Sequence, residues 1–270
     1  MSLRQRWTQW QTSRFLHNHP LDNDEWHSAL ATLPWLSSLD AVQRAHLRMN
    51  VLRFMEQKQF SAAGDFSLDR QKVLLIALLA SLLWPHEEGD IFPGWVEVIV
   101  YPGDFSATHT QAGDAGVMDE KVAAMAGESW LRGPVILSWD TLWQQSQQSS
   151  SPHQLVFHEF AHKLDGMNGA ANGMPPLPRS LRQQEWTQVM TGAYERLNHV
   201  LDQGQKPWID PYAATAPAEF FAVLCEVFFR QPQQLAKAEP GVFSLLCRWF
   251  ANSPGIGLIP EPLRQHSEHA

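Results

Sequence analysis

Residues 151–166, SPHQLVFHEFAHKLDG, constrain the fold of this chain more than any other stretch. They contain His158, Glu159 and His162 in the pattern H-E-x-x-H. On an α-helix, side chains four positions apart lie one turn apart on the same face, so both imidazoles would point the same way. Two such nitrogens can share one Zn²⁺, and the glutamate then lies beside the metal to handle the proton of a bound water.

Local sequence signals around the motif predict this helix independently. Ser151 can cap it, and Pro152 suits the first helical position. Gln154 completes a capping box with Ser151. Gly166 follows the last turn and can end the helix. We therefore expect a helix that begins at Ser151 and stops at Gly166.

The same stretch has two faces at helical spacing. His158 and His162 repeat with Asp165 on one face. The other face is apolar and is expected to pack into the core; it consists of Phe157, Phe160, Ala161 and Leu164. We expect Asp165 to support an imidazole N–H or the start of the helix rather than to bind metal itself.

A catalytic zinc site requires a third protein ligand and an open position for water. The extended pattern H-E-x-x-H-x-x-G-x-x-H fails, because Asp165 replaces the glycine and Asn168 replaces the third histidine. Glu219 is the preferred candidate, since it lies just inside a strongly apolar helix that Pro217 begins, where a carboxylate needs a partner. Glu226, two turns along the same face, is the alternative ligand. A solvent-facing Glu219 near a helix N-terminus is the other interpretation.

Tyr212 lies in the turn that leads into the same helix. A phenol at this position could donate a hydrogen bond to the oxyanion that develops on a substrate carbonyl. Most tyrosines in turns are simply partly buried, so spacing alone gives this role little support.

The rest of the sequence narrows the class of protein. A net charge of −8 without a run of basic residues argues against nucleic-acid binding. The most apolar run, residues 73–84, is shorter than the ~20 residues of a membrane-spanning helix, so we expect a buried core helix. The two cysteines, Cys225 and Cys247, lie in apolar runs and predict buried thiols. The opening residues contain no signal-like apolar segment, so we expect a cytoplasmic protein.

The pattern along the chain predicts a mainly helical α+β protein with a small sheet beside the H-E-x-x-H helix. Strands are expected at residues 95–101 and 133–139, joined by a long polar connection at 103–127 that could fold over a site. Residues 1–33 are expected to form two helical pieces. Further helices are expected over residues 38–60, 73–84, 140–145, 180–203, 217–230 and 233–250. We expect a helical N-terminal part (1–90), a core (91–252) and a flexible tail (253–270).

The strand within residues 133–139 precedes the motif helix and has two interpretations. It could offer a free edge along which an extended peptide aligns. It could equally be an ordinary strand in the interior of the core. Its place in the sheet decides between them.

Two motifs in combination resemble a known family. HEFAH at 158–162, followed by Y-x6-E-F-F-A at 212–222, is similar to the zinc peptidase core shared by the Mlc titration factor family and anthrax lethal factor. GESWLRGPVILSW at 127–139 also resembles the titration factor family. The resemblance covers most of residues 90–250 and implies a zinc peptidase of the gluzincin type.

The resemblance also implies roles for individual residues. One zinc ion per chain would be held by His158, His162 and Glu219. Glu159 would be the base and Tyr212 the donor in the transition state. The resemblance further implies a protein partner, the glucose-responsive transcriptional repressor Mlc. Composition and spacing do not indicate this partner.

Two functions of different classes follow from these expectations. The first is a zinc-dependent peptidase, with an aminopeptidase as one form, which hydrolyses peptide bonds through a metal-activated water and binds the repressor to regulate sugar-uptake genes. The second is a non-catalytic regulatory protein that sequesters the repressor, with a vestigial or structural zinc site. Glu159 favours the first, because a structural site needs no base beside the metal. Neither function involves direct contact with nucleic acid or a membrane.

Overall fold

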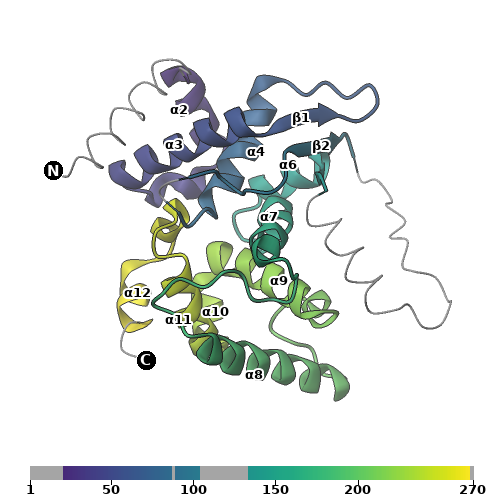
Figure 1. Ribbon diagram of the computed structural model, residues 1–270, viewed down its shortest axis with the longest axis vertical. Helices are drawn as coiled ribbons and strands as arrows, with labels where there is room; N and C mark the ends of the chain where they lie inside the picture. The colour runs from purple at the N-terminus through teal and green to yellow at the C-terminus, as the bar shows by residue number, and fades with distance from the viewer. Residues whose placement is uncertain (1–20, 87–88, 104–132, 268–270) are drawn as a thin grey trace.

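A computed structural model of the chain describes residues 21–86, 89–103 and 133–267 (Figure 1). The first of the two helical pieces expected near the N-terminus lies outside these residues. So do nearly all of the connection at 103–127 and the first part of the stretch at 127–139.

The described chain is mostly helical, as expected. The α-helices are α2 (Asn23–Ala31), α3 (Ala41–Gln57), α4 (Arg70–Leu82), α6 (Trp139–Gln147), α7 (Leu155–Asp165), α8 (Gln183–Asp202), α9 (Pro217–Arg230), α10 (Pro232–Ala238), α11 (Pro240–Trp249) and α12 (Glu261–Ser267). Short 3-10 helices are η1 (Pro34–Ser38), η2 (Gly166–Asn168), η3 (Pro211–Ala214) and η4 (Pro254–Leu258). The strands are β1 (Gln59–Ala62), β2 (Glu97–Tyr101) and β3 (Val135–Ser138).

The three strands form a small parallel sheet in the order β1-β2-β3. Val98 pairs in register with Val135, and Ala62 pairs with Val100. Parallel neighbours require a crossover connection, and α4 supplies it between β1 and β2. Among the described strands β3 pairs only with β2, and it contacts α7. The edge position that peptide alignment requires is therefore present, and the alignment itself stays a prediction.

A buried aromatic cluster fixes the back of α7 to the N-terminal half of the chain. The Phe160 ring of α7 lies 5.4 Å from the Phe54 ring of α3 and 4.9 Å from the Phe92 ring, measured between centroids. Trp95, just before β2, packs on the same ring at 5.6 Å. Such edge-to-face and tilted contacts add to the free energy gained by burying the rings. The helix that carries the motif is thus packed against the N-terminal half of the chain along its buried face.

The helix expected at residues 73–84 is confirmed as a core helix. Asp69 caps α4 by accepting a hydrogen bond from the Lys72 backbone N–H, and Ile76, Leu78 and Leu79 have no exposed surface. In the part of the chain that the structure describes, no helix combines the length and apolarity that crossing a bilayer requires. The apolar run is explained by burial inside the protein.

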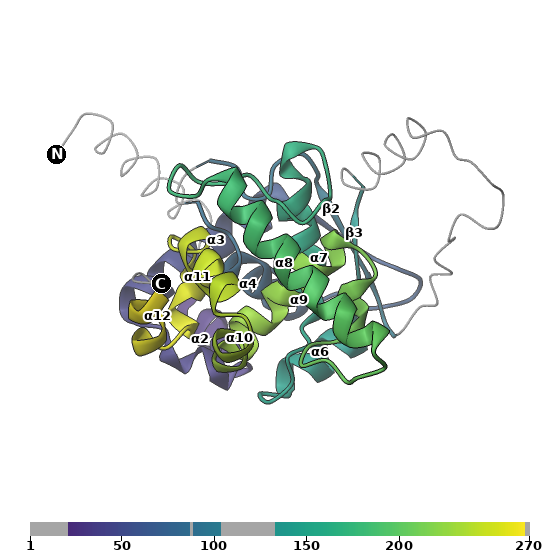
Figure 2. The ribbon, with the colours of Figure 1, turned by 90° about the horizontal axis from the view of Figure 1, so that it is seen from below.

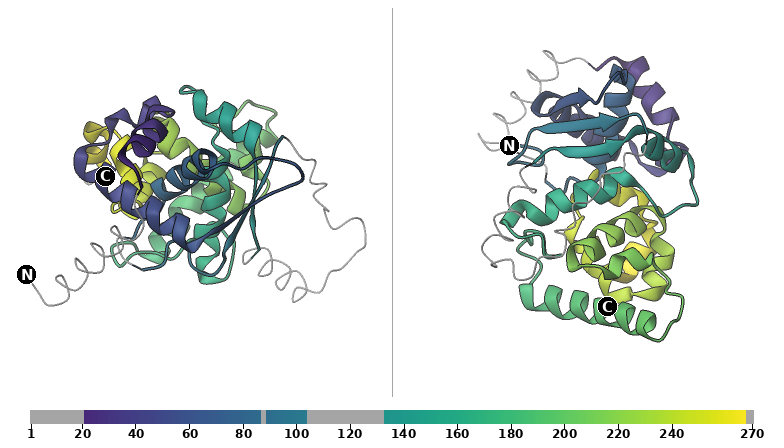
Figure 3. Two further views of the ribbon diagram at one scale, coloured as in Figure 1. Left: turned by 90° about the horizontal axis from the view of Figure 1, so that it is seen from above. Right: turned by 90° about the vertical axis from the view of Figure 1, so that its right-hand side faces the viewer.

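Helices α7 and α9 lie side by side and are the most extensively packed pair of helices in the described fold (Figure 1). Figure 3 (right) shows the sheet on one side of α7 and the helices of the C-terminal half on the other. Helix α8 lies on the outside, where it contacts α11 and η3 (Figure 2). The two helices expected to carry the site are therefore adjacent in the middle of the molecule.

The sequence predicts an apolar face on the helix at residues 38–60, and this prediction is wrong at one position. The expected face consists of Leu39, Val42, Leu47, Val51, Leu52 and Met55. Val42 is 77% exposed, although the apolar pattern of this segment places it in the packing stripe. The buried stripe of α3 runs through Leu47, Val51 and Phe54. At 100° per residue, Val42 lies roughly 140° around the helix from Leu47 and so faces solvent.

Two expectations for the C-terminal region are corrected. The single helix expected at 233–250 is two helices, α10 and α11, because Pro240 lacks the N–H that a continuous helix requires. The expected flexible tail at 253–270 contains η4 and α12. Pro254 and Gly255 are buried, and Gly255 packs so closely on α4 that a Cβ there would lie 2.6 Å from the Leu82 carbonyl oxygen. The division of the chain near residue 90 stays a prediction.

Candidate metal centre

Helix α7 begins later than the sequence predicts. Its N-cap is Gln154, whose side chain accepts a hydrogen bond from the Val156 N–H, whereas Ser151 accepts one from the His153 N–H. The cause is tertiary: the backbone N–H of Gln154 donates to the Glu226 carboxylate of α9 at 2.6 Å, which fixes the chain just before the helix. Gly166 is the C-cap, as expected.

The two faces of α7 are as predicted. Side chains of the apolar face are fully buried; they are Phe157, Phe160, Ala161 and Leu164. The His158 and His162 side chains retain 14% and 22% of their exposure on the other face. Asp165 is completely buried and accepts a hydrogen bond from the Gly173 N–H at 2.8 Å. Its other carboxylate oxygen has no hydrogen-bond partner among the described residues, so the expectation that Asp165 supports an imidazole N–H or the start of the helix is wrong.

Three side chains from α7 and α9 converge on one point. The Nε2 atoms of His158 and His162 are 3.2 Å apart. Glu219 Oε2 lies 3.0 Å from the first and 3.3 Å from the second. Helix α9 begins at Pro217, as predicted, and this start places Glu219 in its first turn, facing α7. The sequence-predicted trio is therefore brought together.

These three residues fit a divalent metal ion. Ligand atoms at ~2.0–2.1 Å from a tetrahedral zinc are separated by roughly 3.3 Å, which matches the distances between the three donor atoms. Two imidazoles and one carboxylate leave a fourth position for water, as in catalytic rather than structural zinc sites. The site is partly exposed, so a substrate can reach it.

The electrostatics of the site favour a positive charge at this point. Burial by itself lowers the pKa of His158, but hydrogen bonds to Glu219 and Glu226 outweigh burial and raise it to about 10. Burial by itself raises the pKa of Glu219, whereas hydrogen bonds to His158 and His162 lower it below its usual value. Carboxylates on both sides of one imidazole are an environment suited to a cation.

Glu159 lies beside the trio on α7, within the electrostatic reach of His158, His162 and Glu219. Burial raises the pKa of Glu159, while the charges of the two histidines oppose the rise. A carboxylate so placed can accept a proton from a nearby group and return it.

Tyr212 lies in η3, immediately before α9. Asp210 caps η3 by accepting a hydrogen bond from the Tyr212 N–H at 2.9 Å. The Tyr212 ring is 45% exposed, and its centroid is 5.9 Å from that of His158. Burial, together with the charge of Glu219 and a hydrogen bond to it, raises the pKa of Tyr212 to about 12. The phenol therefore keeps its proton and can donate it in a hydrogen bond.

Glu226, the alternative ligand, is not part of the converging trio. Its Oε1 lies 2.9 Å from Nδ1 of His158, on the opposite side of the ring from the other donors. The sequence alone predicts that Glu226 lies on the same face of α9 as Glu219, because the two are seven residues apart. The contact with the far side of His158 has no sequence signal, because it depends on how α9 packs on α7.

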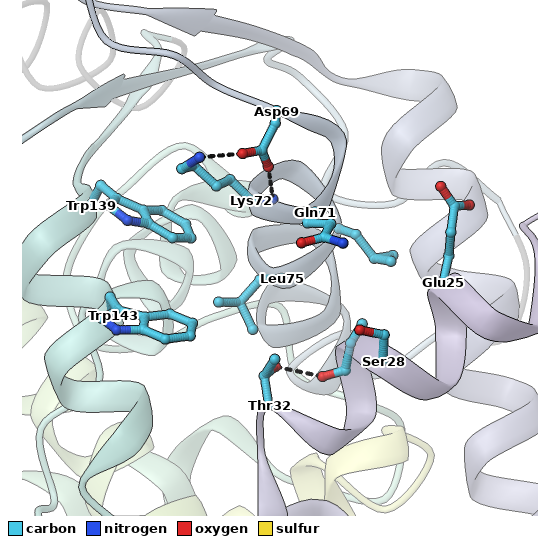
Figure 4. A pocket seen from close by; sticks show the side chains of 11 residues that line it. Glu25, Ser28, Thr32, Asp69, Gln71, Lys72, Leu75, Trp139 and Trp143 are labelled. Carbon is cyan, nitrogen blue, oxygen red and sulfur yellow. Dashed lines mark hydrogen bonds and ion pairs between the residues drawn. The ribbon is translucent and has the colours of Figure 1, made fainter.

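A cavity of about 220 Å³ lies apart from these residues, between α2, α4 and α6 (Figure 4). Trp139 and Trp143 form one wall, and their rings stack with centroids 5.9 Å apart. At its rim Asp69 accepts hydrogen bonds from the backbone N–H and the ammonium group of Lys72, so these charges satisfy each other. No residue of the metal centre is among the described residues that line it.

The chain is similar in sequence to a known protein family and to several bacterial proteins. A family described as glucose-regulated metallo-peptidase M90 matches residues 7–251. An uncharacterized protein of Synechocystis sp. is 34% identical over 252 residues, covering 93% of this chain and 91% of the relative. Mlc titration factor A of Escherichia fergusonii is 34% identical over 245 residues, covering 89% and 91%. Mlc titration factor A of Salmonella gallinarum is 36% identical over 233 residues, covering 85% and 86%.

Proposed function

Because this chain belongs to the glucose-regulated metallo-peptidase M90 family, we propose that it is a zinc-dependent peptidase of the gluzincin type. In this proposal His158, His162 and Glu219 hold one zinc ion per chain. The observation that carries it is the convergence of three donor atoms at 3.0–3.3 Å from one another, next to a partly buried glutamate that is not one of them. Two imidazoles, a carboxylate and an adjacent acid are the parts that metal-assisted hydrolysis requires.

In the proposed hydrolysis each residue of the site has a separate chemical role. Bound zinc supplies Lewis acidity, which lowers the pKa of water toward neutrality and polarises the scissile carbonyl. Glu159 takes a proton from the attacking water as its oxygen bonds to the carbonyl carbon. When the C–N bond breaks, Glu159 returns that proton to the leaving amine. Tyr212 donates a hydrogen bond to the oxyanion of the tetrahedral intermediate.

The partner proposal rests on the relatives named Mlc titration factor A. We propose that this chain also binds a repressor of that kind and so regulates sugar-uptake genes, which places it in the cytoplasm. The alternative is a regulatory protein without catalysis, in which the metal centre is vestigial or structural. The adjacent Glu159 supports catalysis, because binding a repressor does not require a base next to a metal.

Metal analysis combined with hydrolysis of an unbiased peptide library tests the peptidase proposal. We expect about one zinc per chain, cleavage that stops when a chelator removes the metal, and recovery when zinc is restored. The termini of the products separate an aminopeptidase from an endopeptidase. Cleavage that continues at full rate after complete removal of zinc would contradict the proposal.

Phenylalanine in place of Tyr212 is expected to lower kcat by on the order of 10²–10³-fold, because the oxyanion loses a donor. The zinc content should be unchanged, since Tyr212 is not among the three donors. Tyr194→Phe is the matched control: it removes a phenol that donates to the Ala214 carbonyl at 2.7 Å and so also borders η3. Equal losses of kcat in the two variants would show that the shape of η3 matters, and not the Tyr212 hydroxyl.

A further inference from the structure

We propose that Glu226 is a positioning residue, which fixes the tautomer of His158 and the start of α7 with its two carboxylate oxygens. Glu226 and Glu219 lie two turns apart on the face of α9 that packs against α7. They contact opposite sides of the same imidazole. The consequence for metal binding rests on the proposed function, whereas the anchoring of α7 does not.

The first oxygen of Glu226 determines which nitrogen of His158 carries hydrogen. An ionised carboxylate only accepts hydrogen bonds, so the Nδ1 atom at 2.9 Å from Oε1 carries a hydrogen. Nε2 faces His162 and Glu219 and can also donate to Glu219 at 3.0 Å. Because Glu226 holds the hydrogen on Nδ1, Nε2 is the nitrogen that would lose its hydrogen and offer a lone pair when a metal binds. A carboxylate on Nδ1–H also makes Nε2 a stronger donor to a metal.

The second oxygen determines where α7 begins. Oε2 accepts the backbone N–H of Gln154, the N-cap residue, at 2.6 Å. The Gln154 side chain in turn donates to the Ser146 hydroxyl of α6 at 3.2 Å. A carboxylate at a helix N-terminus is favoured by the helix dipole as well as by this hydrogen bond. The same side chain therefore joins α9, which carries Glu219, to the start of α7, which carries both histidines.

Because Glu226 is buried, replacing one of its carboxylate oxygens with an NH₂ group should disturb both of its hydrogen bonds. The side chain is only 7% exposed, so both oxygens depend on these two donors. Glutamine has nearly the same shape but presents one acceptor and one donor group. If its oxygen accepts from His158, its NH₂ group faces the Gln154 N–H. If it is turned over, the NH₂ group faces Nδ1 and favours the tautomer in which Nε2 carries hydrogen and cannot bind metal.

We expect Glu226→Gln to weaken zinc binding by 10–100-fold, as measured by competition with a coloured chelator. Hydrogen exchange of the Gln154 amide should accelerate at least ~10-fold, a readout that needs neither zinc nor activity. Glu226→Asp keeps an acceptor-only group and should recover part of the zinc affinity. Glu239→Gln is the control: Glu239 is also buried and pairs with Arg196 at the junction of α10 and α11. Its zinc affinity should equal that of the unmodified protein.

The outcomes separate this inference from the proposed function. Zinc affinity and Gln154 exchange in Glu226→Gln that both equal those of Glu239→Gln would overturn the positioning role and leave the peptidase proposal intact. If the unmodified protein binds no zinc, the peptidase proposal fails instead, and faster Gln154 exchange in Glu226→Gln alone would still support the anchoring of α7.

Discussion

Glutamine in place of Glu159 is expected to lower kcat by roughly 10²–10⁴-fold while one zinc ion stays bound. Glu159 lies beside the three donor atoms but is not one of them, so its charge is not required to hold the metal. An amide cannot take the proton of the attacking water, and it cannot return one to the leaving amine. Burial raises the pKa of the Glu159 carboxyl, which suits a group that must both accept and return a proton.

The measurement is single-turnover hydrolysis of the best library peptide, with zinc content determined on the same sample. Glu195→Gln, which changes an exposed glutamate of α8, controls for the loss of one negative charge. Turnover by Glu159→Gln equal to that of the control would remove Glu159 from the mechanism. If Glu159→Gln binds the repressor with unchanged affinity, regulation and hydrolysis are separable. If neither the unmodified protein nor any variant hydrolyses peptides, the purely regulatory alternative is favoured.

The parts of the site that sequence could predict are those that depend on local periodicity. The i, i+4 spacing of His158 and His162 places both imidazoles on one face of α7. Pro217 marks the start of α9 and so sets the face that Glu219 presents. Periodicity cannot say that α7 and α9 meet; the family resemblance carries that link, and membership of the family is confirmed.

What sequence could not predict depends on contacts between distant segments. Ser151 has the better local capping pattern, but α7 starts at Gln154 because Glu226 of another helix holds that backbone N–H. The helix expected at residues 38–60 ends at Gln57, and β1 follows at Gln59–Ala62. Gln59 and Ser61 do alternate with two apolar residues, but four residues are too few to predict a strand, and pairing with β2 makes the segment one. The residues after Ser253 have the composition of a tail, yet Gly255 fits against α4 because it has no side chain. In each case tertiary packing overrides the local preference.

The loop after α7 illustrates the same dependence, and it connects the two helices of the metal centre at their other end. Gly173 has φ +78° and lies against the first residue of α9, where an added Cβ would be 2.6 Å from the Pro217 carbonyl oxygen. The Gly173 N–H donates to Asp165 at the end of α7, and its carbonyl accepts the Trp186 indole N–H at 3.0 Å. With both backbone groups held, the glycine cannot move away from α9.

Gly173→Ala is therefore expected to lower the free energy of unfolding by about 2–5 kcal/mol. The left-handed conformation contributes roughly 1–2 kcal/mol and the steric overlap with Pro217 roughly 1–3 kcal/mol. Gly169→Ala is the matched control, because Gly169 has φ +96° but an added Cβ there meets nothing within 4 Å. The free energy of unfolding of both variants is measured with denaturant. Both variants carry the backbone strain, so the difference between their free energies of unfolding gives the cost of the steric overlap with α9. Because Pro217 lies in the same turn as Glu219, the overlap should also weaken zinc binding in Gly173→Ala and not in Gly169→Ala. If Gly173→Ala and Gly169→Ala have equal free energies of unfolding and equal zinc affinities, the loop rearranges to accommodate the added methyl group and does not hold α9 in place.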